Sequence, residues 1–145
     1  MGIQDDLAEQ MRRALKTGQK QRLRVLRMLR AEFQVAQTSG RDFEDVDVVK
    51  SYANTLRKTA EEYEELGRDE KAEQIRGDLA VVEEFLPPQM SAEELEALIG
   101  GIIQENDYGP RDLGRVMKTV MGEHGDVVDG RQAQQIARRL LAGEQ

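Results

Sequence analysis

Apolar residues recur every three or four positions along most of the chain, which is the spacing of one face of an α-helix. In the first part of the chain this pattern predicts four helices, over about residues 5–17, 20–37, 45–66 and 69–86. The second is apolar over much of its circumference, because Val25, Met28 and Val35 widen its stripe, and we expect it to be central. Four helices with short connections predict an antiparallel bundle or two stacked hairpins.

The helical pattern breaks at residues 86–90, Leu-Pro-Pro-Gln-Met. Proline lacks a backbone donor and disfavours helix at the preceding residue, so the fourth helix must end here. The break is the best domain boundary in the chain. It predicts an N-terminal helical domain over residues 1–86, a Pro-Pro hinge over residues 87–90 and a second helical domain over residues 91–145.

A fifth helix is expected to begin directly after this hinge. Ser91, with Glu94 three residues later, forms the sequence pattern of a capping box. Gly100 and Gly101 interrupt the apolar pattern of that helix. At roughly 1 kcal/mol each relative to alanine, we expect them to soften it unless another backbone packs closely there.

The segment from Leu113 to Leu141 predicts two short amphipathic helices joined by a glycine-containing turn. Asp129 lies where the N-cap of the second helix belongs. Each helix places apolar residues on one side and basic or polar residues on the other. The basic residues of this segment and its approach are Arg111, Arg115, Lys118, Arg131, Arg138 and Arg139.

Composition supports an all-α protein. Among 145 residues, 39% are hydrophobic but only 4% are aromatic, so the core must be built from Leu, Val, Ile, Met and Ala. These residues favour helices over β-sandwiches. The length suits one compact domain or two small ones, and no segment has the alternation of a strand.

The sequence also indicates the cellular compartment of the protein and whether it associates with a membrane. The chain has no cysteine, which excludes a disulfide framework and fits a reducing compartment. No apolar run is long enough for a transmembrane helix, and acidic residues stand near the N-terminus where a signal peptide would be basic. We therefore expect a cytoplasmic protein with no membrane partner.

Candidates for catalysis or metal binding are few. His124 is the only histidine, so catalytic triads and histidine-pair zinc sites are ruled out. The acidic run over residues 61–65 belongs to a helix rich in polar residues, where a solvated face is the simpler interpretation. No phosphate-binding glycine loop is present. We expect no catalytic residue, no metal site and no cofactor.

Basic residues on the faces of the predicted helices are the remaining candidates for binding a ligand. A net charge of −7 argues against non-specific binding to nucleic acid, but an acidic protein can still present a basic patch. The six basic residues of the C-terminal segment are candidates to contact a phosphate backbone. A secondary patch on the second helix comprises Lys20, Arg24, Arg27 and Arg30. On the residues alone, solvent-facing charges opposite a core explain both patches more simply. No aromatic residues interleave with them, so any RNA contact would depend on shape and backbone.

Several short stretches together resemble the YqeY family. They are Arg27-Met28-Leu29-Arg30, Gly67-Arg68-Asp69, Glu84-Phe85-Leu86-Pro87, Leu113-Gly114-Arg115-Val116-Met117 and Asp129-Gly130. They cover nearly the whole length in the right order. The resemblance implies an N-terminal four-helix domain and a C-terminal three-helix domain similar to the GatB/YqeY tail of the tRNA-dependent amidotransferase.

In that amidotransferase the tail contributes to binding tRNA, while catalysis belongs to other parts of the complex. The resemblance therefore implies an accessory module of translation that binds tRNA or a tRNA-handling protein. One alternative is a protein-protein adaptor that uses the groove between the two domains. A weaker one is a carbon-nitrogen ligase with glutamine as amido donor, which the residues do not support for this chain alone.

Overall fold

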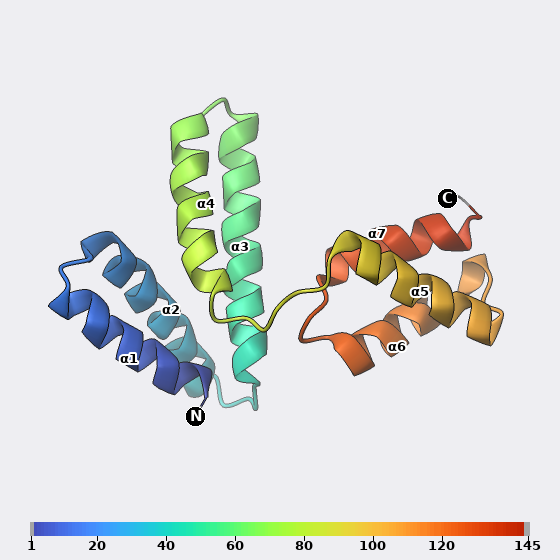
Figure 1. Ribbon diagram of the computed structural model, residues 1–145, viewed down its shortest axis with the longest axis horizontal. Coiled ribbons are helices and arrows are strands. Elements are labelled where there is room, and N and C mark those ends of the chain that lie inside the picture. Colours follow the sequence, from blue (N-terminus) through green and yellow to red (C-terminus); the bar gives the residue numbers. More distant parts are fainter. Residues whose placement is uncertain (1, 144–145) are drawn as a thin grey trace. The chain divides into compact units, whose positions relative to one another are not determined.

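The computed structural model describes residues 2–143 of the chain. Within this range the chain forms seven α-helices and one single-turn 3-10 helix, with no strand (Figure 1). The predicted all-α class is confirmed. Contacts group the chain into two compact units, the first ending at Leu86 and the second beginning at Pro87. Each unit is described by itself.

The N-terminal unit consists of two helical hairpins. Its helices are α1 (Ile3–Lys16), α2 (Lys20–Thr38), α3 (Asp45–Glu65) and α4 (Asp69–Glu83). Helix α1 packs against α2 and α3 against α4, and α2 also contacts both α3 and α4. Of the arrangements predicted from the sequence, two stacked hairpins therefore fits this unit.

Glycines end the first helix of each hairpin. Gly18 and Gly67 adopt left-handed backbone conformations, with φ of 72° and 74°. The next residue then donates its backbone N–H to a carbonyl five positions back, as Gln19 does to Ala14 and Arg68 does to Tyr63. This geometry satisfies carbonyls at the helix end that have no partner inside the helix.

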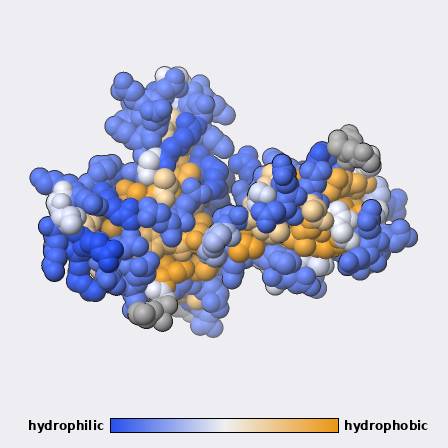
Figure 2. Space-filling model, viewed as in Figure 1, coloured by the Kyte–Doolittle hydropathy of each residue, from blue (hydrophilic) through white to orange (hydrophobic). Residues whose placement is uncertain are grey.

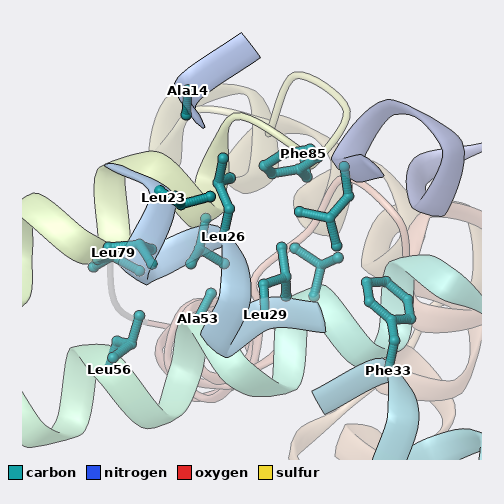
Figure 3. Packing of buried hydrophobic residues seen from close by; sticks show 13 residues of the cluster. Ala14, Leu23, Leu26, Leu29, Phe33, Ala53, Leu56, Leu79 and Phe85 are labelled. Carbon is teal, nitrogen blue, oxygen red and sulfur yellow. The ribbon is translucent and has the colours of Figure 1, made fainter. Parts of the chain in front are cut away.

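Helix α2 supplies the centre of the hydrophobic core. Leu26, Leu29 and Phe33 are almost fully buried and pack among side chains of the neighbouring helices (Figure 3). The predicted central position of this helix is confirmed. Its stripe is narrower than expected, because Val25 is buried whereas Met28 and Val35 are 48% and 65% exposed. Three helices cover α2 without enclosing it.

Helix α4 ends at Glu83, three residues before the predicted end at Leu86. The backbone tightens there, because Phe85 donates its N–H to the carbonyl of Val82 and Leu86 donates to Glu83. The helix thus closes with three-residue turns before it reaches Leu86, the residue that Pro87 disfavours in a helical conformation. The turn places Phe85 in the core of the unit, where it is 5% exposed.

The C-terminal unit is a three-helix assembly. It comprises α5 (Ala92–Asn106), the 3-10 turn η1 (Pro110–Asp112), α6 (Leu113–His124) and α7 (Gly130–Leu141). Helix α7 packs against both α5 and α6, which also contact each other. Figure 2 shows hydrophobic surface on each unit bordered by hydrophilic side chains. The completely buried side chains of this unit are Leu95, Ile99, Val116, Val120, Ala133 and Ala137.

Two of the predicted caps are present in this unit. The Ser91 hydroxyl accepts from the Glu94 backbone N–H at 3.1 Å, and the Glu94 carboxylate accepts from the Ser91 N–H at 3.2 Å. Asp129 accepts from the backbone N–H groups of Arg131 and Gln132. The starts of α5 and α7 are therefore fixed by side chains that the sequence identifies.

Helix α5 runs through Gly100 and Gly101 without a break, and the expected softening at these residues stays a prediction. A β-carbon built at either glycine meets no heavy atom within 4 Å beyond the adjacent residues and the helix's own backbone, so there is room for a side chain at both positions. The packing of neighbouring residues, including the buried Leu95 and Ile99, holds the helix together despite its poor local propensity.

Candidate nucleic-acid interface

Three cations follow the outer side of η1 and α6. Arg111, Arg115 and Lys118 lie four and three positions apart, so they share one face, and all three are exposed. Val116 and Val120 of the same helix are completely buried on the other side. The amphipathic split predicted for this helix is confirmed.

Arg115 has a weak partner within its own turn. Its guanidinium lies 3.5 Å from an Asp112 carboxylate oxygen, and its side chain remains 73% exposed. The other Asp112 oxygen accepts the Gly109 backbone N–H at 2.8 Å, so this carboxylate already serves the turn before α6. An exposed pair at this distance contributes little and is screened by salt, which leaves Arg115 able to contact another anion.

Helix α7 presents a second basic face. Arg131 and Arg138 are seven residues apart, which places them on the same side, and both are exposed. Ala133 and Ala137 are completely buried on the opposite side. From Gly130 to Leu141 the helix carries three arginines and no acidic residue, so its local charge is positive although the whole chain is acidic.

Arg139 is not part of that face. Its guanidinium lies 2.9 Å from a carboxylate oxygen of Glu96 on α5. One residue beyond Arg138 corresponds to a rotation of about 100° around the helix, which turns Arg139 toward its neighbour. Arg139 therefore belongs to a contact between α5 and α7.

The secondary patch on α2 is divided in the same way. Arg24 donates to both carboxylate oxygens of Asp78 on α4, at 2.9 Å each. Lys20, Arg27 and Arg30 are exposed, and among residues 2–143 none of the three forms an ion pair. Asp78 lies between Ile75 and Leu79 on the buried side of α4, and this acidic residue in an apolar stripe is the sequence feature that could have identified the pair.

The structure offers little other chemistry. Over the described residues, no group of three or more His, Cys, Asp or Glu side chains is placed to hold a metal ion. His124 stands at the end of α6 with its Nε2 3.8 Å from the exposed carboxylate of Glu123. None of the helices between residues 2 and 143 combines the length and the apolar character that a membrane span requires. Of the features predicted from the sequence, the clustered cations are the one that an anionic ligand can recognise.

Comparison with known families decides the relationship of this chain. The family described as Yqey-like protein matches residues 4–141, which is nearly the whole sequence. The chain belongs to the YqeY family. The resemblance inferred from its short stretches is thus confirmed, and the YqeY match spans both compact units. No curated protein matches the chain. The YqeY description names no activity, so function has to be argued from the surfaces.

Proposed function

We propose that this YqeY chain is an accessory module that binds tRNA, or docks on tRNA-handling machinery, through the outer faces of α6 and α7. The observation that carries this proposal is the one-sided placement of cations opposite completely buried apolar residues on both helices. We define the tail face by its members Arg111, Arg115, Lys118, Arg131 and Arg138.

Electrostatics favours a phosphate backbone as the ligand of the tail face. Arginine and lysine donate several hydrogen bonds to phosphate oxygens, and their binding releases counterions from the nucleic acid. Helix α7 contains no acidic residue that would repel the backbone. Since aromatic residues are absent from both faces, base stacking plays no part, and recognition would rest on shape and phosphate position.

The two compact units are proposed to be separate domains with different tasks. Residues 1–86 would form a four-helix domain, residues 87–90 a linker, and residues 91–145 a tail domain that supplies the tRNA contact. The proposal places the protein in the cytoplasm, in translation, and assigns it no catalytic site of its own. We expect no glutamine-dependent amide transfer from the purified chain.

Titration of tRNA at low and moderate salt tests the proposal. The test variant is R115E/K118E/R138E, which reverses three exposed cations of the tail face. A matched control is R41E/K58E/K71E, which changes the net charge equally but affects exposed residues of the N-terminal unit. We expect salt-dependent binding that the first variant loses and the control retains. Equal affinity in both variants, or wild-type binding without salt dependence, would contradict the proposal.

A further inference from the structure

A groove between α1 and α2 combines an apolar floor with a basic rim. It has a volume of about 360 Å³, and its lining includes Met11, Arg12 and Leu15 from α1 and Leu23, Arg27 and Arg30 from α2. Figure 2 shows strongly hydrophilic side chains over α1 beside hydrophobic surface of the same unit. Leu15 is 66% exposed, so the groove presents a large aliphatic side chain that a bound molecule would remove from water.

Some arginines on α1 and α2 form ion pairs with carboxylates, and others do not. The arginines outside the groove are paired: Arg13 with Glu9 at 3.3 Å, Arg22 with Glu84 at 2.9 Å and Arg24 with Asp78 at 2.9 Å. The three groove arginines have no carboxylate partner among residues 2–143. From Arg12 to Arg30 the sequence also contains no acidic residue. The positive charge of the three arginines at the rim of the groove is thus uncompensated by carboxylates of the described residues.

We propose that the α1–α2 groove binds an acidic amphipathic helix of a partner protein. Apolar side chains at three- and four-residue spacing on such a helix would cover Met11 and Leu15, as a third helix packs on a helical pair. Asp or Glu side chains flanking that stripe would reach the guanidinium groups, whose planar donors match a carboxylate in two places.

Charge complementarity and the apolar floor favour this occupant over nucleic acid. Phosphates would satisfy the arginines but leave Leu15 and Met11 in contact with water. Nucleobases would find no aromatic side chain among the lining residues on which to stack. Arg27 and Arg30 would therefore contact a protein partner, whereas the tail face would contact tRNA.

The test uses the full chain and two synthetic helical peptides. Both have leucines at three- and four-residue spacing; one carries glutamates beside the leucines and the other carries lysines. Fluorescence anisotropy of labelled peptide measures binding. We expect the acidic peptide to bind the wild type, and the R27E/R30E variant to lose at least about tenfold in affinity. The same variant is expected to gain affinity for the basic peptide, because its rim is now negative.

A pair of matched single variants isolates the apolar contribution. Leu15 and Val35 are exposed to nearly the same extent, 66% and 65%, but Val35 lies outside the groove. We expect Leu15→Ser to weaken binding of the acidic peptide and Val35→Ser to leave it unchanged. Circular dichroism of each variant checks that the helices are intact.

Three outcomes would overturn the inference. The first is equal binding of both peptides to wild type and R27E/R30E. The second is that tRNA displaces the peptide and R27E/R30E weakens tRNA binding as strongly as the tail-face variant, which would make the groove a nucleic-acid site. The third is concentration-dependent self-association abolished by Leu15→Ser, which would make a second copy of the chain the occupant. Loss of tRNA binding in the tail-face variant alone leaves the groove inference standing.

Discussion

Arg24 on α2 places one guanidinium nitrogen 2.9 Å from both carboxylate oxygens of Asp78 on α4. Asp78 is 7% exposed, whereas the side chain of Arg24 is half exposed. Breaking the ion pair therefore costs more free energy at Asp78 than at Arg24. A free arginine here can turn to water, but a free Asp78 carboxylate stays in a poorly hydrated position.

This inequality predicts different costs for removing each partner. We expect Arg24→Met to lower the free energy of unfolding by roughly 1–3 kcal/mol, because it leaves a buried charge without its donor. Asp78→Asn keeps an acceptor for Arg24 and is expected to cost less. Urea unfolding followed by circular dichroism measures both changes. Equal costs, or a larger cost for Asp78→Asn, would show that the burial of Asp78 does not govern the pair.

Glu84 and Arg22 provide a pH-dependent contribution to stability. Their hydrogen bond at 2.9 Å lowers the pKa of Glu84 below its ordinary value of 4.5 and raises that of Arg22. A carboxyl group with a lowered pKa in the folded state stabilises that state above its ordinary pKa. This contribution is lost as the pH falls through the lowered value.

We therefore expect Glu84→Gln to be less stable than the wild type at neutral pH and nearly equal to it at strongly acidic pH. The difference should be small, a few tenths of a kcal/mol, because both side chains are partly exposed to water and salt. Urea unfolding across this pH range measures it. Glu65→Gln, which removes an exposed carboxylate with no ion pair among the described residues, is the control and should show no such convergence.

The glycines of α5 predict a stabilising substitution. A β-carbon at Gly100 or Gly101 meets no atom within 4 Å, and both residues are helical. We expect Gly100→Ala and Gly101→Ala each to raise the free energy of unfolding by about 0.5–1 kcal/mol. Gly67→Ala is the contrasting variant, because φ at Gly67 is 74° and alanine would be strained there. Destabilisation by the α5 substitutions would indicate a contact that the residues described here do not make.

The sequence predicts structural features that depend on residues close in the chain better than features that depend on contacts between helices. Gly18, Gly67, Ser91 and Asp129 end or begin helices through bonds to residues close in the chain, and their roles were predictable. The end of α4 was predicted three residues too late because Leu86 continues the apolar spacing. Phe85 is held in the core by a turn whose effect depends on the surrounding helices.

The candidate site was less predictable for the same reason. Arg24 and Arg139 have the same local pattern as their exposed neighbours, and helical spacing alone does not separate them. Their partners Asp78 and Glu96 lie on other helices and far away in sequence. Only the packing of α2 on α4, and of α5 on α7, shows that these two cations are already neutralised.

Arg138 and Arg139 are adjacent, and the structure predicts opposite consequences for their loss. Arg139→Ala removes the contact to Glu96 and is expected to lower the free energy of unfolding by a few tenths to about 1 kcal/mol, with little effect on tRNA affinity. Arg138→Ala is expected to leave stability unchanged, because the side chain is exposed and opposite the buried face of α7.

If the tail face binds a phosphate backbone, Arg138→Ala should instead weaken tRNA binding and reduce the slope of log affinity against log salt by about one. Urea unfolding and tRNA titration on the same preparations separate the two residues, since each variant acts as the control for the other. A reduced salt slope for Arg139→Ala and none for Arg138→Ala would place the phosphate contact on the α5 side of α7 and would contradict the tail face as defined.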